Sequence, residues 1–243
     1  MRRPPVLAPV LAAALVGACS SAPDGTTVTV YAAASLTEVF TGLGADFQAA
    51  NPGARVSFNF GGSSALAQQI GQGAPADVFA SASPATMEQV AAEVDRPVTF
   101  ARNRLEIAVP GGNPAGVTGL ADFGRAEARI ALCAERVPCG AATGEVFRAA
   151  GVTPRPDTLE QDVKAVLTKV RLGEVDAALV YRTDVRAAGG EVEGIGFAEA
   201  ERAVNDYPIA PLKRASPRGR QFVDFVVSEA GRAALTAAGF DVP

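Results

Sequence analysis

The sequence contains no histidine, and it has only three cysteines and three tyrosines. Without histidine, no Ser-His-Asp triad can form. The Ser-x-x-Lys spacing of serine–lysine hydrolases is also missing from the chain. These absences disfavour a hydrolytic enzyme and favour a protein that binds its ligand without chemical change.

Basic residues are in deficit, with 22 Lys and Arg against 26 Asp and Glu. If Arg2 and Arg3 are removed with a leader, 20 basic residues face 26 acidic ones, a net charge of about −6. Nucleic-acid binding is disfavoured because it requires a basic face. An anion would have to be held by local donors, since the overall charge does not attract it.

Long apolar runs are absent except at the N-terminus. Residues 6–16 form an apolar stretch of about eleven residues, which is too short for a mature membrane span. Arg2 and Arg3 precede it, and the run Val16-Gly17-Ala18-Cys19 resembles the bacterial lipobox. We expect a lipoprotein signal peptide over 1–18, lipid on Cys19 and a tether over 19–26. The alternative is a plain secretory signal with an incidental cysteine.

Short β-branched runs alternate with helical patterns along the remaining roughly 220 residues. Such alternation predicts an α/β fold with mainly parallel sheets flanked by helices. Strands are expected at 27–32, 55–60, 77–80, 104–109, 129–133, 177–181 and 207–212. Helices are expected at 36–50, 65–71, 84–94, 141–150, 163–172, 218–228 and 230–238.

A cluster of helix and strand breakers, Pro110-Gly111-Gly112-Asn113-Pro114, interrupts this alternation near the middle of the chain. We take it as the boundary between two lobes. The prediction is one lobe from 27–108 and 206–243 and a second from 109–205, with the chain crossing near 108–111 and 204–208. Ligand would bind in the cleft and close a hinge.

Four short polar loops each run into a helical pattern. Helix N-termini carry free N–H groups that bind anions, and ligands of α/β folds bind beyond the C-terminal ends of strands. The sequence therefore predicts that the loops meet at one anion site. They are Ala33-Ala34-Ser35, Gly61-Gly62-Ser63-Ser64, Val137-Pro138-Cys139-Gly140 and Gln161-Asp162-Val163.

Each residue of these loops also has a purely structural interpretation. Ser35 with Glu38 three residues later forms a capping-box pattern, in which the serine caps its own helix. Asp162 is expected to cap the following helix rather than bind a ligand. Tyr181 ends an apolar strand, so its ring either borders the core or directs its hydroxyl into the cleft.

Several runs in this order resemble the periplasmic molybdate-binding proteins of ABC transporters, which have a two-lobed type II solute-binding fold. The resemblance extends from about Thr27 to Phe240. It also implies five oxyanion ligands, which are named at the end of this paragraph. Gly61-Gly62 replaces a more usual Ala/Ser pair, so the register leaves Ser63 or Ser64 as the main ligand of its loop. The runs are 30–37, 62–67, 73–82, 137–140, 162–163 and 180–184, and the implied ligands are Ser35, Ser63, Cys139, Val163 and Tyr181.

The resemblance implies an exported, lipid-anchored protein on the outer side of the cytoplasmic membrane. It would capture molybdate or tungstate and deliver the anion to the permease and ATPase subunits of an importer. No cofactor, cation site or nucleic-acid partner is expected, and the chain would be a monomer. The same fold binding sulfate, thiosulfate or phosphonate is the main alternative. A sensory domain of a transcription regulator conflicts with the leader, and three scattered tyrosines disfavour ferric ion.

If Cys19 carries lipid, Cys133 and Cys139 remain in an exported chain, where thiols usually pair. They lie six residues apart, across the loop that joins an expected strand to an expected helix. A turn bringing their Cα atoms within about 6 Å would allow a disulfide. The alternative is two small buried apolar residues.

Overall fold

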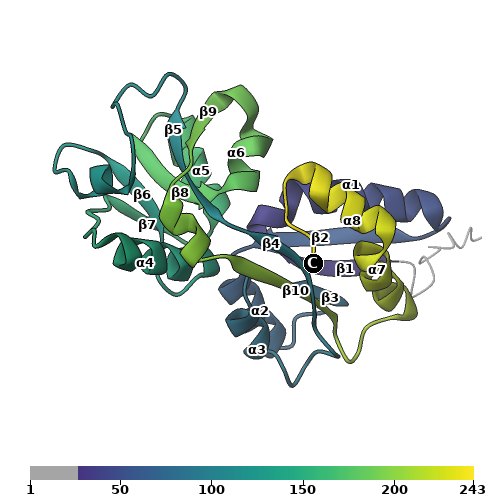
Figure 1. The fold of residues 1–243 in the computed structure, drawn as a ribbon. Coiled ribbons are helices and arrows are strands. Elements are labelled where there is room, and N and C mark those ends of the chain that lie inside the picture. The colour runs from purple at the N-terminus through teal and green to yellow at the C-terminus, as the bar shows by residue number, and fades with distance from the viewer. Residues whose placement is uncertain (1–26) are drawn as a thin grey trace, which may run out of the picture.

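The computed structural model describes residues 27–243, and these form two lobes, each built on a five-stranded sheet (Figure 1). The expected signal peptide, tether and lipid-bearing Cys19 lie outside the described residues. Within residues 27–243, no helix is both long and apolar enough to cross a membrane.

The sheet of the first lobe has the strand order β2-β1-β3-β10-β4. β1 lies parallel to both β2 and β3, whereas β10 pairs antiparallel with β3 and β4. The strands are β1 (Thr27–Ala33), β2 (Arg55–Gly61), β3 (Val78–Ala80), β4 (Val98–Asn103) and β10 (Asn205–Pro211).

The sheet of the second lobe repeats this arrangement with the order β7-β6-β8-β5-β9. β6 lies parallel to β7 and β8, and β5 pairs antiparallel with β8 and β9. Each sheet is therefore mixed, which corrects the expected parallel majority while the α/β fold class is confirmed. The strands are β5 (Leu105–Pro110), β6 (Ile130–Cys133), β7 (Thr158–Glu160), β8 (Ala177–Tyr181) and β9 (Val192–Ile195).

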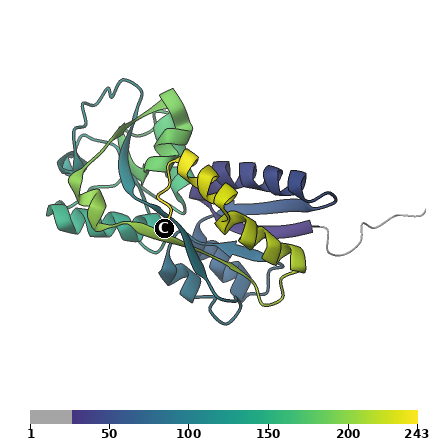
Figure 2. The ribbon, with the colours of Figure 1, turned by 45° about the vertical axis from the view of Figure 1, so that its right-hand side comes forward.

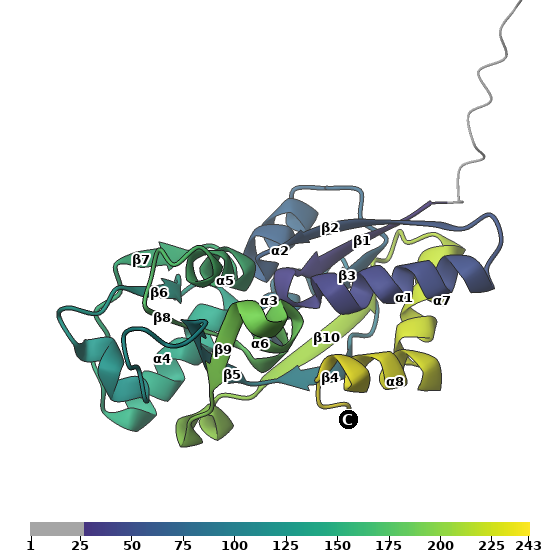
Figure 3. The ribbon, with the colours of Figure 1, turned by 90° about the horizontal axis from the view of Figure 1, so that it is seen from above.

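The chain passes between the lobes at Arg104, which separates β4 of the first sheet from β5 of the second (Figure 3). The predicted boundary at 108 is therefore wrong, because the breaker cluster after Pro110 forms a turn inside the second lobe. The return crossing ends at Asn205, next to the expected boundary at 206. Asp241 holds the crossing region together by ion pairs with Arg104 (2.8 Å) and Arg182 (2.7 Å).

Helices cover both faces of the first sheet (Figures 1 and 2). One face packs with α1, α7 and α8 around Phe40, Phe47 and Phe222, and the other packs with α2 and α3 around Leu66 and Ile70. The helices of this lobe are α1 (Thr37–Ala50), α2 (Ser63–Gly71), α3 (Pro84–Glu88), α7 (Pro217–Val227) and α8 (Glu229–Ala238).

The second lobe has one continuous core, in which the apolar strands β6 and β8 lie at the centre. Phe123 and Phe147 pack together at its outer side, with ring centroids 5.4 Å apart. Its helices are α4 (Pro138–Ala150), α5 (Val163–Arg171) and α6 (Arg182–Ala188).

The expected helix over 84–94 is only α3, because beyond Glu88 the chain continues in i,i+3 turns such as Val90 N to Met87 O. Four elements were not expected from the sequence: β4, β7, α6 and β9. β7 and β9 are edge strands of three and four residues, and strands this short leave little alternation to detect.

Candidate functional site

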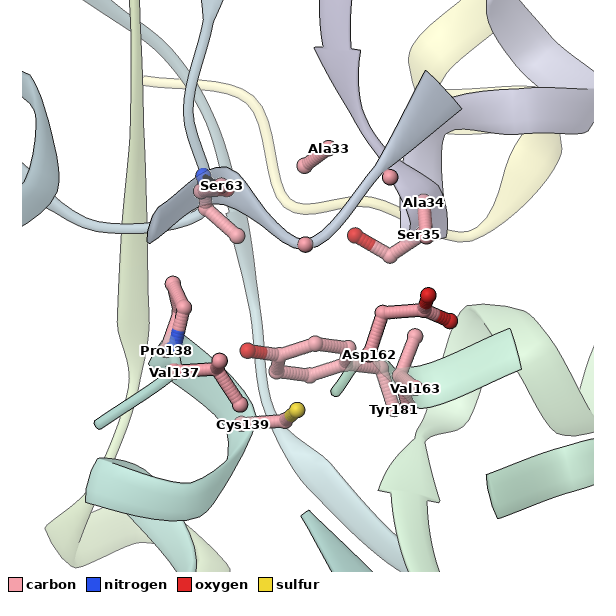
Figure 4. A pocket seen from close by; sticks show the side chains of 13 residues that line it. Ala33, Ala34, Ser35, Ser63, Val137, Pro138, Cys139, Asp162, Val163 and Tyr181 are labelled. Atoms are coloured by element: carbon pink, nitrogen blue, oxygen red, sulfur yellow. Dashed lines mark hydrogen bonds between the residues drawn. The ribbon is translucent and has the colours of Figure 1, made fainter. Parts of the chain in front are cut away.

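A small cavity lies between the two lobes (Figure 4). Its volume of about 20 Å³ is room for one small guest. The lining residues are Ala33, Ala34, Ser35, Gly61, Gly62, Ser63, Ala82, Val137, Pro138, Cys139, Asp162, Val163 and Tyr181.

The structure brings together all five residues that the sequence singled out as ligands. Ser35 follows β1 and Ser63 begins α2 directly after β2, both in the first lobe. In the second lobe Cys139 lies in the first turn of α4, Val163 begins α5, and Tyr181 ends β8. All five therefore stand at the C-terminal ends of strands, where α/β folds bind ligands.

Backbone donors from both lobes border the cavity. Within the described residues no acceptor is bound to the N–H of Ser63, Cys139 or Val163, because each lies in the first turn of a helix. The N-termini of α2, α4 and α5 thus present free N–H groups and partial positive charge to the same space. Such an arrangement suits an anion.

The structure distinguishes the two serines of the glycine loop. Ser63 is buried and lines the cavity, and its Oγ accepts a hydrogen bond from Ala82 N at 3.0 Å, which leaves its proton to donate. Ser64 instead donates to Arg136 O at 2.8 Å and does not line the cavity. Of the two serines, Ser63 is therefore the one that faces the cavity.

The capping-box interpretation of Ser35 is wrong. Neither Ser35 nor Leu36 makes a side-chain cap at the start of α1, and Glu38 binds Lys164 rather than the backbone. Ser35 Oγ lies 2.9 Å from the hydroxyl of Tyr207, a residue that the sequence did not indicate. Figure 4 shows the Ser35 side chain directed into the cavity, whereas its buried partner Tyr207 is not among the lining residues.

Tyr181 directs a buried hydroxyl into the cavity (Figure 4). Its side chain is only 1% exposed, and its Oη has no hydrogen-bond partner among the described residues. Burial, with a smaller contribution from Tyr207, raises the pKa of Tyr181 well above its ordinary value. The group is a neutral phenol that lacks an acceptor, and a bound oxyanion would supply one.

Among residues 27–243, no Lys or Arg lines the cavity. Its one carboxylate belongs to Asp162, which caps α5 by accepting Ala165 N at 3.0 Å, as predicted. Among the described residues, no group of three His, Cys, Asp or Glu is placed to hold a metal ion. The free donors that border the cavity are therefore neutral.

Contacts between the lobes flank the cavity. Lys164 of α5 lies 2.8 Å from Glu38 of α1 in the first lobe. It also lies 3.0 Å from the buried Asp184 of α6 in its own lobe. Gly62 packs against the backbone of Gln161, where a Cβ would lie 2.3 Å from the carbonyl oxygen. The two lobes are therefore in contact beside the cavity.

The buried carboxyl of Asp184 predicts a pH dependence of stability. Burial raises its pKa from 3.8 to about 6, although Lys164 opposes the shift. The folded protein then binds more protons than the unfolded chain between these values. The contribution of Asp184 to the free energy of unfolding is full below about pH 4 and lost as pH rises through about 6, a fall of about 2–3 kcal/mol.

Urea unfolding across this pH range should show that Asp184→Asn removes this fall in the free energy of unfolding. The same fall in the variant would contradict this, and Asp46→Asn, on the exposed side of α1, is the control.

Cys133 and Cys139 are joined by a disulfide, with Cα atoms 5.8 Å apart. The bond ties the end of β6 to the first turn of α4. Close packing continues at Gly140, where a Cβ would lie 1.9 Å from the carbonyl oxygen of Ala134. The donor loop at Cys139 is therefore held from two sides.

The disulfide should contribute to stability more than to affinity. The double variant Cys133→Ala/Cys139→Ala is expected to lose about 2 kcal/mol of unfolding free energy, since the closed loop is short. Because the contact expected of Cys139 with an anion is its N–H, which alanine keeps, the anion affinity should stay within about threefold. Denaturant unfolding and calorimetry measure the two effects. Free thiols at Cys133 and Cys139 in the denatured, unreduced wild type would contradict the bond.

Two lobes joined by two crossings, with strand ends and helix N-termini converging on a cavity between them, define a two-lobed ligand-binding protein. The chain belongs to the bacterial extracellular solute-binding proteins, whose family description matches residues 28–241. It is 43% identical over 234 residues to the molybdate-binding protein ModA of Mycobacterium tuberculosis strain H37Rv, covering 92% of this chain and 90% of that relative. Proteins of this kind bind solutes for transport, so the chain is not an enzyme.

Two solved structures share the fold at low sequence identity. The periplasmic molybdate-binding protein of Azotobacter vinelandii matches with a TM-score of 0.76 at 20% identity, over 89% of this chain and 99% of that one. The sulfate-binding protein SubI of Mycobacterium tuberculosis matches with a TM-score of 0.77 at 16% identity, over 89% and 87%. Both confirm the two-lobed α/β architecture.

Proposed function

We propose that this protein captures molybdate and tungstate in the cavity between its lobes. The observation that carries the proposal is a lining made of neutral donors with one unpartnered phenol, that of Tyr181. The proposed ligands are the hydroxyls of Ser35, Ser63 and Tyr181 and the N–H groups of Ser35, Ser63, Cys139 and Val163. The 43% identity to a molybdate-binding protein supports the choice of anion.

The donor set also supports selectivity. Each hydrogen bond to a charged oxygen contributes about 1.5–3 kcal/mol, so about seven of them offset desolvation and leave micromolar or tighter affinity. Hydrogen phosphate carries a proton that needs an acceptor, and leaving it unpaired costs a few kcal/mol. Asp162 is the one carboxylate among the described lining residues, and its Oδ1 already caps α5, which reduces what the cavity offers that proton.

Calorimetric titration of the mature protein tests this function. Molybdate and tungstate are expected to bind at micromolar or tighter affinity, and phosphate at least ~100-fold more weakly. Sulfate is the matched comparison, because it is also unprotonated near neutral pH but smaller. Preference for sulfate would assign the protein to the alternative oxyanion class. Phosphate binding as tight as molybdate binding would contradict the neutral-donor account.

We further propose that the protein is a monomeric lipoprotein that delivers its anion to the permease and ATPase subunits of an ABC importer. The lipobox-like run before Cys19 supports the lipid anchor, and membership of an extracellular family supports export. Closure of the lobes on the anion would give the importer one loaded shape to recognise. Mass spectrometry of the membrane-extracted protein should find lipid on Cys19, and replacement by Ser should release the protein from the membrane.

A further inference from the structure

Tyr207 lies directly behind the anion cavity without lining it. It is fully buried on β10, the strand on which the chain returns to the first lobe. The pairing of β10 with β4 shifts register between Tyr207 and Pro208, and irregularities of this kind re-aim a side chain. Its hydroxyl lies 2.9 Å from Ser35 Oγ.

Either hydroxyl can donate the hydrogen bond between them, and this choice decides whether Ser35 presents a proton or only lone pairs to the cavity. If Ser35 donates to Tyr207, the serine presents only lone pairs to an anion, and the contact is repulsive. If Tyr207 donates, the proton of Ser35 is free to point at the anion. A phenol is a stronger acid than an aliphatic alcohol, so the second arrangement is also favoured chemically.

We propose that Tyr207 is a positioning residue of the anion site, resting on the oxyanion-binding function proposed above. Its phenol donates to Ser35 Oγ and thereby directs the serine proton into the cavity. Because a hydroxyl that accepts a hydrogen bond becomes a better donor, Tyr207 also strengthens the contact of Ser35 with the anion. The specificity for a fully deprotonated oxyanion thus depends on a residue that does not touch it.

The surroundings of Tyr207 hold its ring in place and keep its hydroxyl protonated. Its ring packs edge to face with Tyr181 of the second lobe at 6.0 Å and with Phe240 at 5.6 Å. Burial raises the pKa of Tyr207 above its ordinary value, so the group keeps its proton at any physiological pH. The packing of the ring therefore holds the Tyr207 hydroxyl, a neutral donor, between two proposed ligands, Ser35 of the first lobe and Tyr181 of the second.

A double-mutant cycle with molybdate as the probe tests the inference. Tyr207→Phe keeps the ring and is expected to weaken binding about 5- to 20-fold by calorimetry. In the Ser35→Ala background the same change should alter the affinity by less than about twofold, because Tyr207 acts through Ser35. Tyr31→Phe, which removes a hydroxyl from the core of the same lobe, is the control and should bind within about twofold of wild type.

Two outcomes would overturn the inference alone. One is wild-type affinity in Tyr207→Phe, and the other is an equal loss with and without Ser35, which would mean a general structural effect. A wild type that does not bind molybdate at all would overturn both this inference and the proposed function. A loss confined to the background that contains Ser35 would support it.

Discussion

The Gly62→Ala variant is expected to lose at least about 100-fold in molybdate affinity while each lobe keeps its fold. Gly62 has φ −61° and ψ 126°, a conformation open to any residue, so alanine fits the local backbone. Its Cβ, however, would lie 2.3 Å from the carbonyl oxygen of Gln161 in the opposite lobe. The lobes could not close, and the anion would lose the donors of the second lobe.

Gly71→Ala, at the other end of α2, is the matched control, because a Cβ there meets nothing within 4 Å and Gly71 does not line the cavity. Calorimetry should show near-wild-type binding for Gly71→Ala. Solution scattering should show that molybdate compacts the wild type but not Gly62→Ala. Full affinity and ligand-induced compaction in Gly62→Ala would show that closure of the lobes at this point is not needed for binding.

The second large effect is expected from the two serine ligands. Ser63→Ala and Ser35→Ala should each weaken molybdate binding by about 1.5–3 kcal/mol, or roughly 10- to 150-fold, because a charged oxygen loses a hydroxyl donor. Ser64→Ala should lose much less, since that hydroxyl makes an exposed hydrogen bond to Arg136 O of the other lobe and does not line the cavity. Calorimetry of the three variants measures all of this. A large loss in Ser64→Ala with none in Ser63→Ala would show that Ser64, and not Ser63, binds the anion.

The sequence was sufficient to place the donor loops because the signal is local. A helix N-terminus after a strand is visible in a few residues, such as Gly62-Ser63-Ser64 after the run that ends at Gly61. The α/β alternation then requires such loops to share one edge of each sheet. For this reason Ser35, Ser63, Cys139, Val163 and Tyr181 could all be proposed before the structure, with the family resemblance selecting among the candidates.

Features that depend on distant pairs could not be predicted in this way. Tyr207 joins Ser35 across 172 positions and Lys164 joins Glu38 across 126, and neither partner carries a local pattern. The boundary of the lobes was wrong for a related reason. A run of Pro and Gly marks a turn, whereas the true crossing at Arg104 lies inside a nearly continuous extended segment with no breaker.

Placement of the anion itself is the most direct test of the account. Crystals of the wild-type protein grown with molybdate should give one strong anomalous peak at the molybdenum absorption edge. The account predicts the peak inside the cavity between the lobes, with the oxyanion within hydrogen-bond distance of Ser35, Ser63, Tyr181 and the N–H groups of Cys139 and Val163. A peak elsewhere in the molecule, or in the cavity but bonded to only one lobe, would contradict it.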